Sequence, residues 1–123
     1  MRQRVAELYL KELSGVKGLI LPNYNRAMRP NYSYLPVRVT QEARVDREGL
    51  VDQLRSSGVI PRRYFHPLVP EFQYYRSNAS ANPELYPVAI KASQEVLCLP
   101  IYPELSDATI HYICSTILAV LDP

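Results

Sequence analysis

The residues best suited to ligand binding lie close together in the middle of the chain. Arg62, Arg63, Tyr64 and His66 bring two guanidinium groups, a phenol and an imidazole into one short stretch. Guanidinium groups bind carboxylates and phosphates well because their N–H groups form a fixed fork. If the stretch is a strand, alternation places Arg62, Tyr64 and His66 on one face, which suits an anion or sugar hydroxyls. The alternative is a solvated strand edge with His66 in a turn before Pro67, and the residues alone leave both interpretations open.

Groups for covalent or metal chemistry are missing from the sequence. We expect Cys98 and Cys114 to be buried free thiols, because cysteine packs as a small hydrophobic residue. Neither cysteine has the spacing of a zinc ligand, and neither His66 nor His111 has a nearby acid in the sequence to orient it. The four glycines form no phosphate-binding loop pattern. The sequence therefore predicts no catalytic residue and no metal site in this chain.

Composition limits the classes of partner. A chain of 123 residues with 47% apolar residues suits a single globular domain. Its net charge is only +2 and the basic residues are scattered, whereas nucleic-acid binding needs clustered cations. No apolar run approaches the ~20 residues of a membrane-spanning helix. We therefore expect neither a nucleic-acid nor a membrane partner, and with no signal-peptide pattern we expect a cytoplasmic protein.

Helical and strand patterns alternate along the chain. Helices are predicted at 2–14, 45–58, 87–95 and 106–121, strands at 32–40, around Arg62–His66 and at 96–101, and loops at 19–31 and 69–86. Asp46 and Ser106 are predicted helix N-caps. The last helix is predicted to bury Ile110, Ile113, Cys114, Ile117 and Leu121. This order indicates an α+β fold, with a small three-stranded, mainly antiparallel sheet packed with about four helices.

Four stretches together carry a family resemblance. They are Tyr32–Val37, then Arg47–Leu50 with Leu54 and Gly58-Val59, then Arg63–Leu68, and last Leu99–Ser106. In this order and spacing they resemble the DegT/StrS-like family of sugar aminotransferases. The resemblance implies the fold-type I architecture, dependence on pyridoxal phosphate and action on nucleotide-linked keto sugars.

The resemblance is to the C-terminal third of that family. The family's Schiff-base lysine lies in a large N-terminal domain, and Lys11, Lys17 and Lys91 lie in stretches unlike the lysine motif. The resemblance therefore implies that residues 1–123 are a single C-terminal small domain, in which 1–14 is a helix leading from a missing large domain. The first helix begins without a capping residue ahead of it, which fits this interpretation.

The same resemblance implies the cofactor, the partners and the site residues. Pyridoxal phosphate is expected in the intact enzyme and no cofactor in this fragment alone, which should complete the substrate pocket without being catalytic by itself. The implied partners are the missing large domain and a nucleotide-sugar substrate, in a homo-oligomer.

The resemblance also implies which residues line the site. Tyr64 falls where the family has an aromatic or histidine residue on the substrate side of the pocket. Arg62 and Arg63 lie beside it, where they could meet the charge of the substrate. Val69 replaces a frequent histidine of the family, and His66 precedes Pro67 instead. We therefore assign Arg62, Arg63, Tyr64 and His66 to substrate binding.

A second hypothesis belongs to another class of protein. Residues 72–86 are rich in tyrosine, and tyrosine and arginine are common in protein–protein interfaces. The chain could then be an autonomous binding or oligomerisation module that docks a protein partner through this Tyr-rich loop. Such a module would need no second domain.

Overall fold

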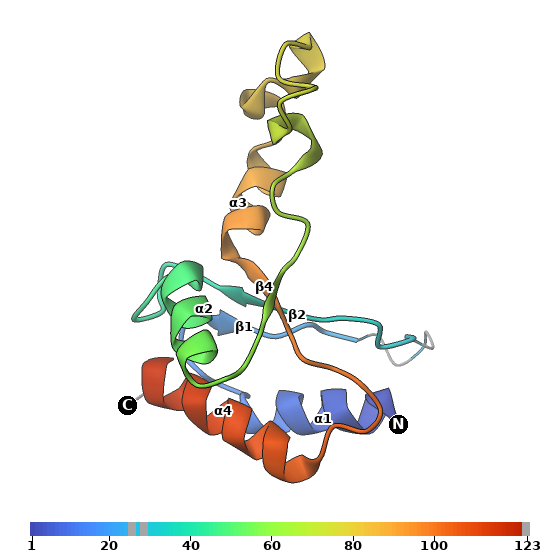
Figure 1. Ribbon diagram of the computed structural model, residues 1–123, viewed down its shortest axis with the longest axis vertical. Helices are drawn as coiled ribbons and strands as arrows, with labels where there is room; N and C mark the ends of the chain where they lie inside the picture. The colour runs from blue at the N-terminus through green and yellow to red at the C-terminus, as the bar shows by residue number, and fades with distance from the viewer. Residues whose placement is uncertain (25–26, 28–29, 122–123) are drawn as a thin grey trace.

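The computed structural model describes residues 1–24, 27 and 30–121. Over these ranges the chain forms four α-helices, a four-stranded sheet and three 3-10 turns (Figure 1). Their bounds are α1 Arg2–Glu12, β1 Leu19–Ile20, β2 Leu35–Val39, α2 Arg47–Ser56, β3 Arg62–Arg63, η1 Val69–Glu71, η2 Ala79–Ala81, η3 Pro83–Leu85, α3 Pro87–Glu95, β4 Val96–Leu99 and α4 Asp107–Leu121. The predicted α+β class is confirmed. No helix within these ranges is both long and apolar enough to cross a bilayer.

The sheet is antiparallel throughout and has the strand order β1-β2-β4-β3. In its centre Leu35 of β2 lies opposite Leu99 of β4, and Val37 lies opposite Leu97. All four side chains are buried in one core with residues of α1, α2 and α4. Because side chains alternate along a strand, Pro36 and the other residues that lie between the buried positions point to the other side of the sheet. We call this side, turned away from the helices α1, α2 and α4, the outer face.

The predicted number of strands was wrong, because the structure has four where the sequence predicted three. The additional strand is β1, which lies in the predicted loop 19–31 and pairs with the end of β2. A strand of two residues is too short to show the alternation on which the prediction relies. Gly18 sets the turn before β1, with a φ of +77° and its carbonyl accepting from the amide of Thr40 at 2.8 Å. Positions 25, 26, 28 and 29 of the predicted loop lie outside the described residues.

The second and last helices begin where the sequence predicted. The Asp46 side chain accepts a hydrogen bond from the amide of Gly49 at 2.8 Å, which satisfies a free N–H of the first turn. Ser106 Oγ accepts from the amide of Thr109 at 3.1 Å in the same way. The predicted core face of α4 is buried at every position, namely Ile110, Ile113, Cys114, Ile117 and Leu121. The predicted N-caps and the predicted buried face of α4 are thus confirmed.

Residues 69–90 form an arm that projects from the rest of the molecule (Figure 1). It contains the three 3-10 turns and the first part of α3. From 72 to 89 every residue except Ala81 is exposed, including Tyr74 at 85% and Val88 at 81%. Exposed apolar side chains gathered on one feature are typical of a surface that contacts another polypeptide. The arm is thus the part of the structure with the least burial of its own.

Two cysteines and one tyrosine of the described residues are buried together with their polar groups. Cys98 and Cys114 are both buried and free, as the sequence predicted. Burial raises the pKa of Cys98 to about 11 and the pKa of Cys114 to about 12, so both stay protonated at neutral pH. Tyr9 of α1 is fully buried, and its hydroxyl has no hydrogen-bond partner within the described part of the chain. Burial also raises the pKa of this phenol.

We expect Leu54→Ala to lower the free energy of unfolding by roughly 2–5 kcal/mol, because it opens a cavity in a fully buried part of α2. Urea denaturation followed by circular dichroism measures the change. The matched control is Gln53→Ala, an exposed neighbour on the same helix, which should change this free energy by no more than about 0.5 kcal/mol. Equal effects of the two substitutions would show that Leu54 is not a core residue.

We expect Tyr9→Phe to keep or raise the free energy of unfolding, by up to about 1 kcal/mol, because a buried hydroxyl without a partner is costly. The control is Tyr112→Phe, since the Tyr112 hydroxyl donates to the Ser57 carbonyl at 2.9 Å and its removal should lower this free energy. Both changes are measured in the same urea experiment. A loss of more than about 1 kcal/mol in Tyr9→Phe would contradict the unpaired state of that hydroxyl.

Candidate functional site

The predicted site residues lie at the edge of the sheet, but the strand that carries them is shorter than expected. The strand β3 consists of Arg62 and Arg63 alone, which pair with Cys98 and Leu97 of β4. The chain then turns at Tyr64 and Phe65, and Phe65 adopts a φ of +47° that a continuing strand does not allow. The alternation expected for Arg62 to His66 therefore ends at Arg63.

Arg63 is engaged in an ion pair with Glu48, from the first turn of α2. Its Nε donates to both carboxylate oxygens, at 3.1 and 3.2 Å, and its Nη2 contacts Glu48 Oε2. This hydrogen bond lowers the pKa of Glu48 and raises the pKa of Arg63. The guanidinium of Arg63 therefore already has a protein partner, which the sequence did not predict.

Arg62 lies on the opposite side of the sheet from Arg63. It pairs in register with Cys98, whose strand neighbours Leu97 and Leu99 both point into the helical core. Alternation therefore places Arg62 and Cys98 on the outer face. The Arg62 charge acts on the Cys98 thiol, where it partly offsets the rise in pKa that burial causes. Arg62 itself is exposed, so its guanidinium is open to a ligand.

Tyr64 contacts an aromatic partner that the sequence analysis did not single out. Its ring centroid lies 5.2 Å from that of Tyr34, the residue directly before β2, and 4.3 Å from that of Phe65. Tyr34 is partly exposed and accepts a hydrogen bond through its carbonyl from the Tyr24 hydroxyl at 2.9 Å. The alternation that buries Leu35 was a usable signal, because it places Tyr34 on the outer face with Pro36.

His66 is exposed and lines a hollow of about 400 Å³ at the base of the arm. The residues around this hollow are Arg62, Arg63, Phe65, His66, Pro67, Leu68, Val69 and Phe72. Three of the four predicted residues thus border one space, while Tyr64 turns towards Tyr34 instead. The hollow combines cationic and apolar groups, which suits an anion that carries an apolar part.

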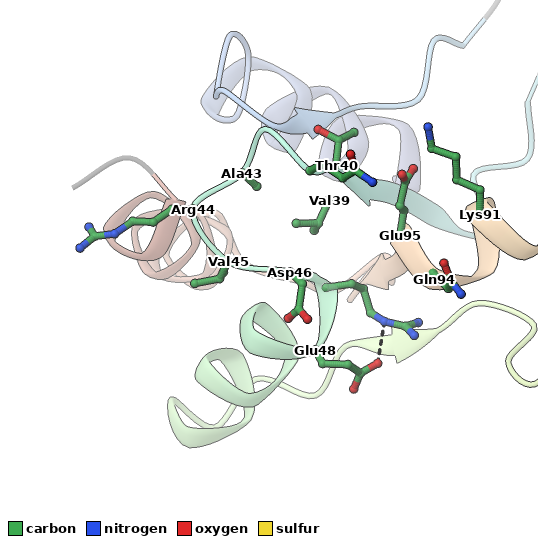
Figure 2. Close-up of a pocket in the computed structure, with 12 residues that line it drawn as sticks. Val39, Thr40, Ala43, Arg44, Val45, Asp46, Glu48, Lys91, Gln94 and Glu95 are labelled. Carbon is green, nitrogen blue, oxygen red and sulfur yellow. Dashed lines mark ion pairs between the residues drawn. The ribbon is translucent and has the colours of Figure 1, made fainter.

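A second hollow, of about 690 Å³, lies between the start of α2 and the foot of α3 (Figure 2). Arg47 and Glu48 border it from α2, and their ion pair is the dashed line in the figure. Lys91 and Glu95 border it from α3, and Glu95 also accepts from Arg38 Nε at 3.0 Å. Charges of both signs alternate around this space, so it has no surplus of cations for an anionic ligand. Within the described part of the chain no three metal-binding side chains gather.

Comparisons with known proteins agree with one another. The DegT/DnrJ/EryC1/StrS aminotransferase family model matches residues 1–118. The chain is 30% identical over 117 residues to the dTDP-4-amino-4,6-dideoxy-D-glucose transaminase of Escherichia coli, which covers 95% of this chain and 32% of that protein. It is 34% identical over 110 residues to the enzyme of the same name from Shigella dysenteriae, covering 88% and 28%. The crystal structure of the aminotransferase TlmJ from Streptoalloteichus hindustanus superimposes with a TM-score of 0.80 at 28% identity, over 96% of this chain and 30% of TlmJ. The chain therefore spans about a third of the length of the relatives that it matches.

We expect the pKa of Glu48 to rise back towards its ordinary value in Arg63→Gln, because the hydrogen bond from Arg63 is the largest cause of its lowering. The carboxyl carbon shift of Glu48, followed by NMR against pH, measures this change. The ion pair stabilises the fold above the ordinary glutamate pKa, and this contribution is lost as the pH falls through the lowered value.

Arg62→Gln is the matched control for this titration. Arg62 neighbours Arg63 in sequence but lies on the outer face, so its removal should leave the pKa of Glu48 nearly unchanged. An equal rise in both variants would contradict the separation of the two arginines across the sheet.

Proposed function

Since the chain belongs to the DegT/DnrJ/EryC1/StrS aminotransferase family, we propose that residues 1–123 are the small domain of an aminotransferase acting on nucleotide-linked keto sugars. In this proposal 1–14, with α1, leads from a large domain, and the small domain completes the substrate pocket. The observation that carries the proposal is one of coverage. The match extends over nearly the whole chain but over only 32% of the transaminase from Escherichia coli.

Enzymes of this family depend on pyridoxal phosphate, which supplies the amino-group transfer chemistry. The lysines of this chain do not fit that cofactor. Lys11 lies on α1, Lys17 in the turn that follows and Lys91 on α3, and all three are exposed. A Schiff-base lysine has to lie inside the pocket that holds the cofactor. We therefore place the cofactor in the intact enzyme, and we infer that this chain alone is not catalytic.

In the proposed pocket this chain binds and orients the substrate. Arg62 is exposed on the outer face, where it would pair with the charge of the nucleotide diphosphate. Tyr64, whose ring packs against that of Tyr34, would present its hydroxyl to the substrate as a hydrogen-bonding group. His66 would contribute from the hollow that it shares with Arg62. Arg63 has weaker support as a direct ligand, because Glu48 already holds its guanidinium.

The proposed partner is a lysine-bearing large domain. The exposed apolar groups of the arm and of the outer face, among them Phe72, Tyr74 and Val88, would be covered by that domain. We further propose that the intact enzyme is a homo-oligomer in the cytoplasm. The comparisons give no support to the alternative of an autonomous binding or oligomerisation module, although it uses the same Tyr-rich surface.

A chimera tests this proposal. We expect the chain alone, mixed with pyridoxal phosphate, to transfer no amino group from dTDP-4-amino-4,6-dideoxy-D-glucose to a 2-oxo acid. Joined to the remaining two-thirds of the Escherichia coli transaminase in place of its matching segment, the 117 residues of this chain that match should restore the transfer. Product formation is measured by chromatography. A folded, cofactor-loaded chimera without activity would contradict the proposal, as would activity of the chain alone.

In an active chimera, Tyr64→Phe should reduce kcat/KM by about tenfold or more, while the melting temperature changes little, because the partly exposed phenol serves the substrate and not the core. Tyr112→Phe is the control, since its hydroxyl bonds to the Ser57 carbonyl away from the site and should leave kcat/KM unchanged. Unchanged kcat/KM in Tyr64→Phe would show that the Tyr64 hydroxyl does not contact the substrate.

A further inference from the structure

The geometry points to Glu48 as a positioning residue of the substrate site. In this inference Glu48 holds Arg63 and thereby fixes the turn that presents Arg62 and Tyr64. Its significance for the substrate rests on the proposed function, but its structural part does not. Sequence analysis did not single out Glu48 as a site residue.

Glu48 and Arg63 are in direct contact through their side chains. Arg63 Nε lies 3.1 and 3.2 Å from the two oxygens of Glu48, and its Nη2 approaches one of them as well. A guanidinium held at two nitrogens by a carboxylate is fixed in orientation as well as in position. The strand β3 has only two residues in the ladder, and this ion pair adds a side-chain contact between it and α2.

Glu48 is itself in contact with a second arginine, Arg47. Its neighbour Arg47 is only 5% exposed, and Arg47 Nε lies 2.7 Å from Glu48 Oε1, an ion-pair contact without the geometry of a hydrogen bond. Arg47 Nη1 also donates to the carbonyl of Val96, the first residue of β4, at 3.2 Å. A buried arginine is held in place by such partners because its charge is costly to leave unpaired. Glu48 is therefore tied both to its own helix and, through Arg47, to the central strand.

The two adjacent arginines of β3 have different roles because they point to opposite sides of the sheet. Arg63 points to the side of the sheet that α2 covers, where Glu48 binds it, while Arg62 points to the outer face beside Cys98. Directly after Arg63 the chain turns, and Tyr64 meets Tyr34. Fixing Arg63 therefore fixes the position of Arg62 before it and of Tyr64 after it.

The ion pair is partly exposed, with 45% of the Glu48 side chain and 30% of the Arg63 side chain accessible. Exposed ion pairs contribute little to global stability because water and salt screen them. We therefore expect loss of the pair to displace the turn more than it lowers the stability of the fold. This difference distinguishes a positioning residue from a merely structural one.

The test uses the 123-residue chain and NMR. The nuclear Overhauser contact between the rings of Tyr34 and Tyr64 reports on the turn, together with the amide shifts of residues 62–66. Glu48→Gln and Arg63→Gln should each lose the ring contact and shift these amides, and the double variant should show no larger change than either single one. Arg62→Gln is the matched control and should keep the ring contact.

Retention of the ring contact and of the amide shifts in both Glu48→Gln and Arg63→Gln would overturn the inference. If Glu48→Gln fails to fold, Arg63→Gln decides alone, because Arg63 lies outside the helices. Loss of the fold in both variants would also overturn it, since the pair would then hold the core and not the turn. Additive changes in the double variant would show that the two residues act separately, which again contradicts it.

Titration with dTDP connects the turn to binding. We expect Arg62→Gln to weaken dTDP binding about tenfold by removing a charged partner, and Glu48→Gln to weaken it by displacing Arg62. Equal dTDP affinity of Glu48→Gln and the wild type, with a displaced turn, would remove Glu48 from any role in the site. If the wild-type chain and the active chimera both fail to bind dTDP, the proposed function is at fault, while the ring contact still decides whether Glu48 positions the turn.

Discussion

The rest of the structure depends on the pairing of β2 with β4 and the burial of one face of that pair. Leu35, Val37, Leu97 and Leu99 pack beneath α1, α2 and α4, and each fully buried aliphatic side chain contributes about 1.5–3 kcal/mol. Because strand side chains alternate, burying these four sends Arg62 and Cys98 to the outer face. The helix-covered face is thus occupied by the core, and the outer face is left for contacts with ligand or with another domain.

Ion pairs then hold some of the side chains that the sheet positions. Two consecutive arginines on β3 fall on opposite sides, and the one facing α2 meets a carboxylate, that of Glu48. The same carboxylate lies against Arg47, which bonds to the start of β4. A single acidic side chain therefore links a helix, the central strand and the edge strand at the point where the chain turns towards the candidate site.

Local signals explain which features the sequence could predict. The caps at Asp46 and Ser106 and the buried face of α4 depend on residues within a few positions of one another, and all were predicted. The family could also be predicted, because each of the four stretches that carry the resemblance is a short segment of the sequence. The strand β1 could not, since it is defined by its pairing with β2, and neither could the early end of β3 before the turn at Phe65, since β3 is defined by its pairing with β4. For the same reason the sequence grouped Arg63 with Arg62, although its partner lies on α2.

The central claim is that this chain supplies the outer face of a substrate pocket whose chemistry lies in a second domain. A crystal structure of the chimeric enzyme with a bound dTDP-linked amino sugar tests it most directly. The account predicts that the guanidinium of Arg62 lies within hydrogen-bond distance of the diphosphate, that Tyr64 borders the ligand, and that the large domain covers the outer face. A ligand held entirely by the large domain, with Arg62 and Tyr64 in solvent, would contradict it.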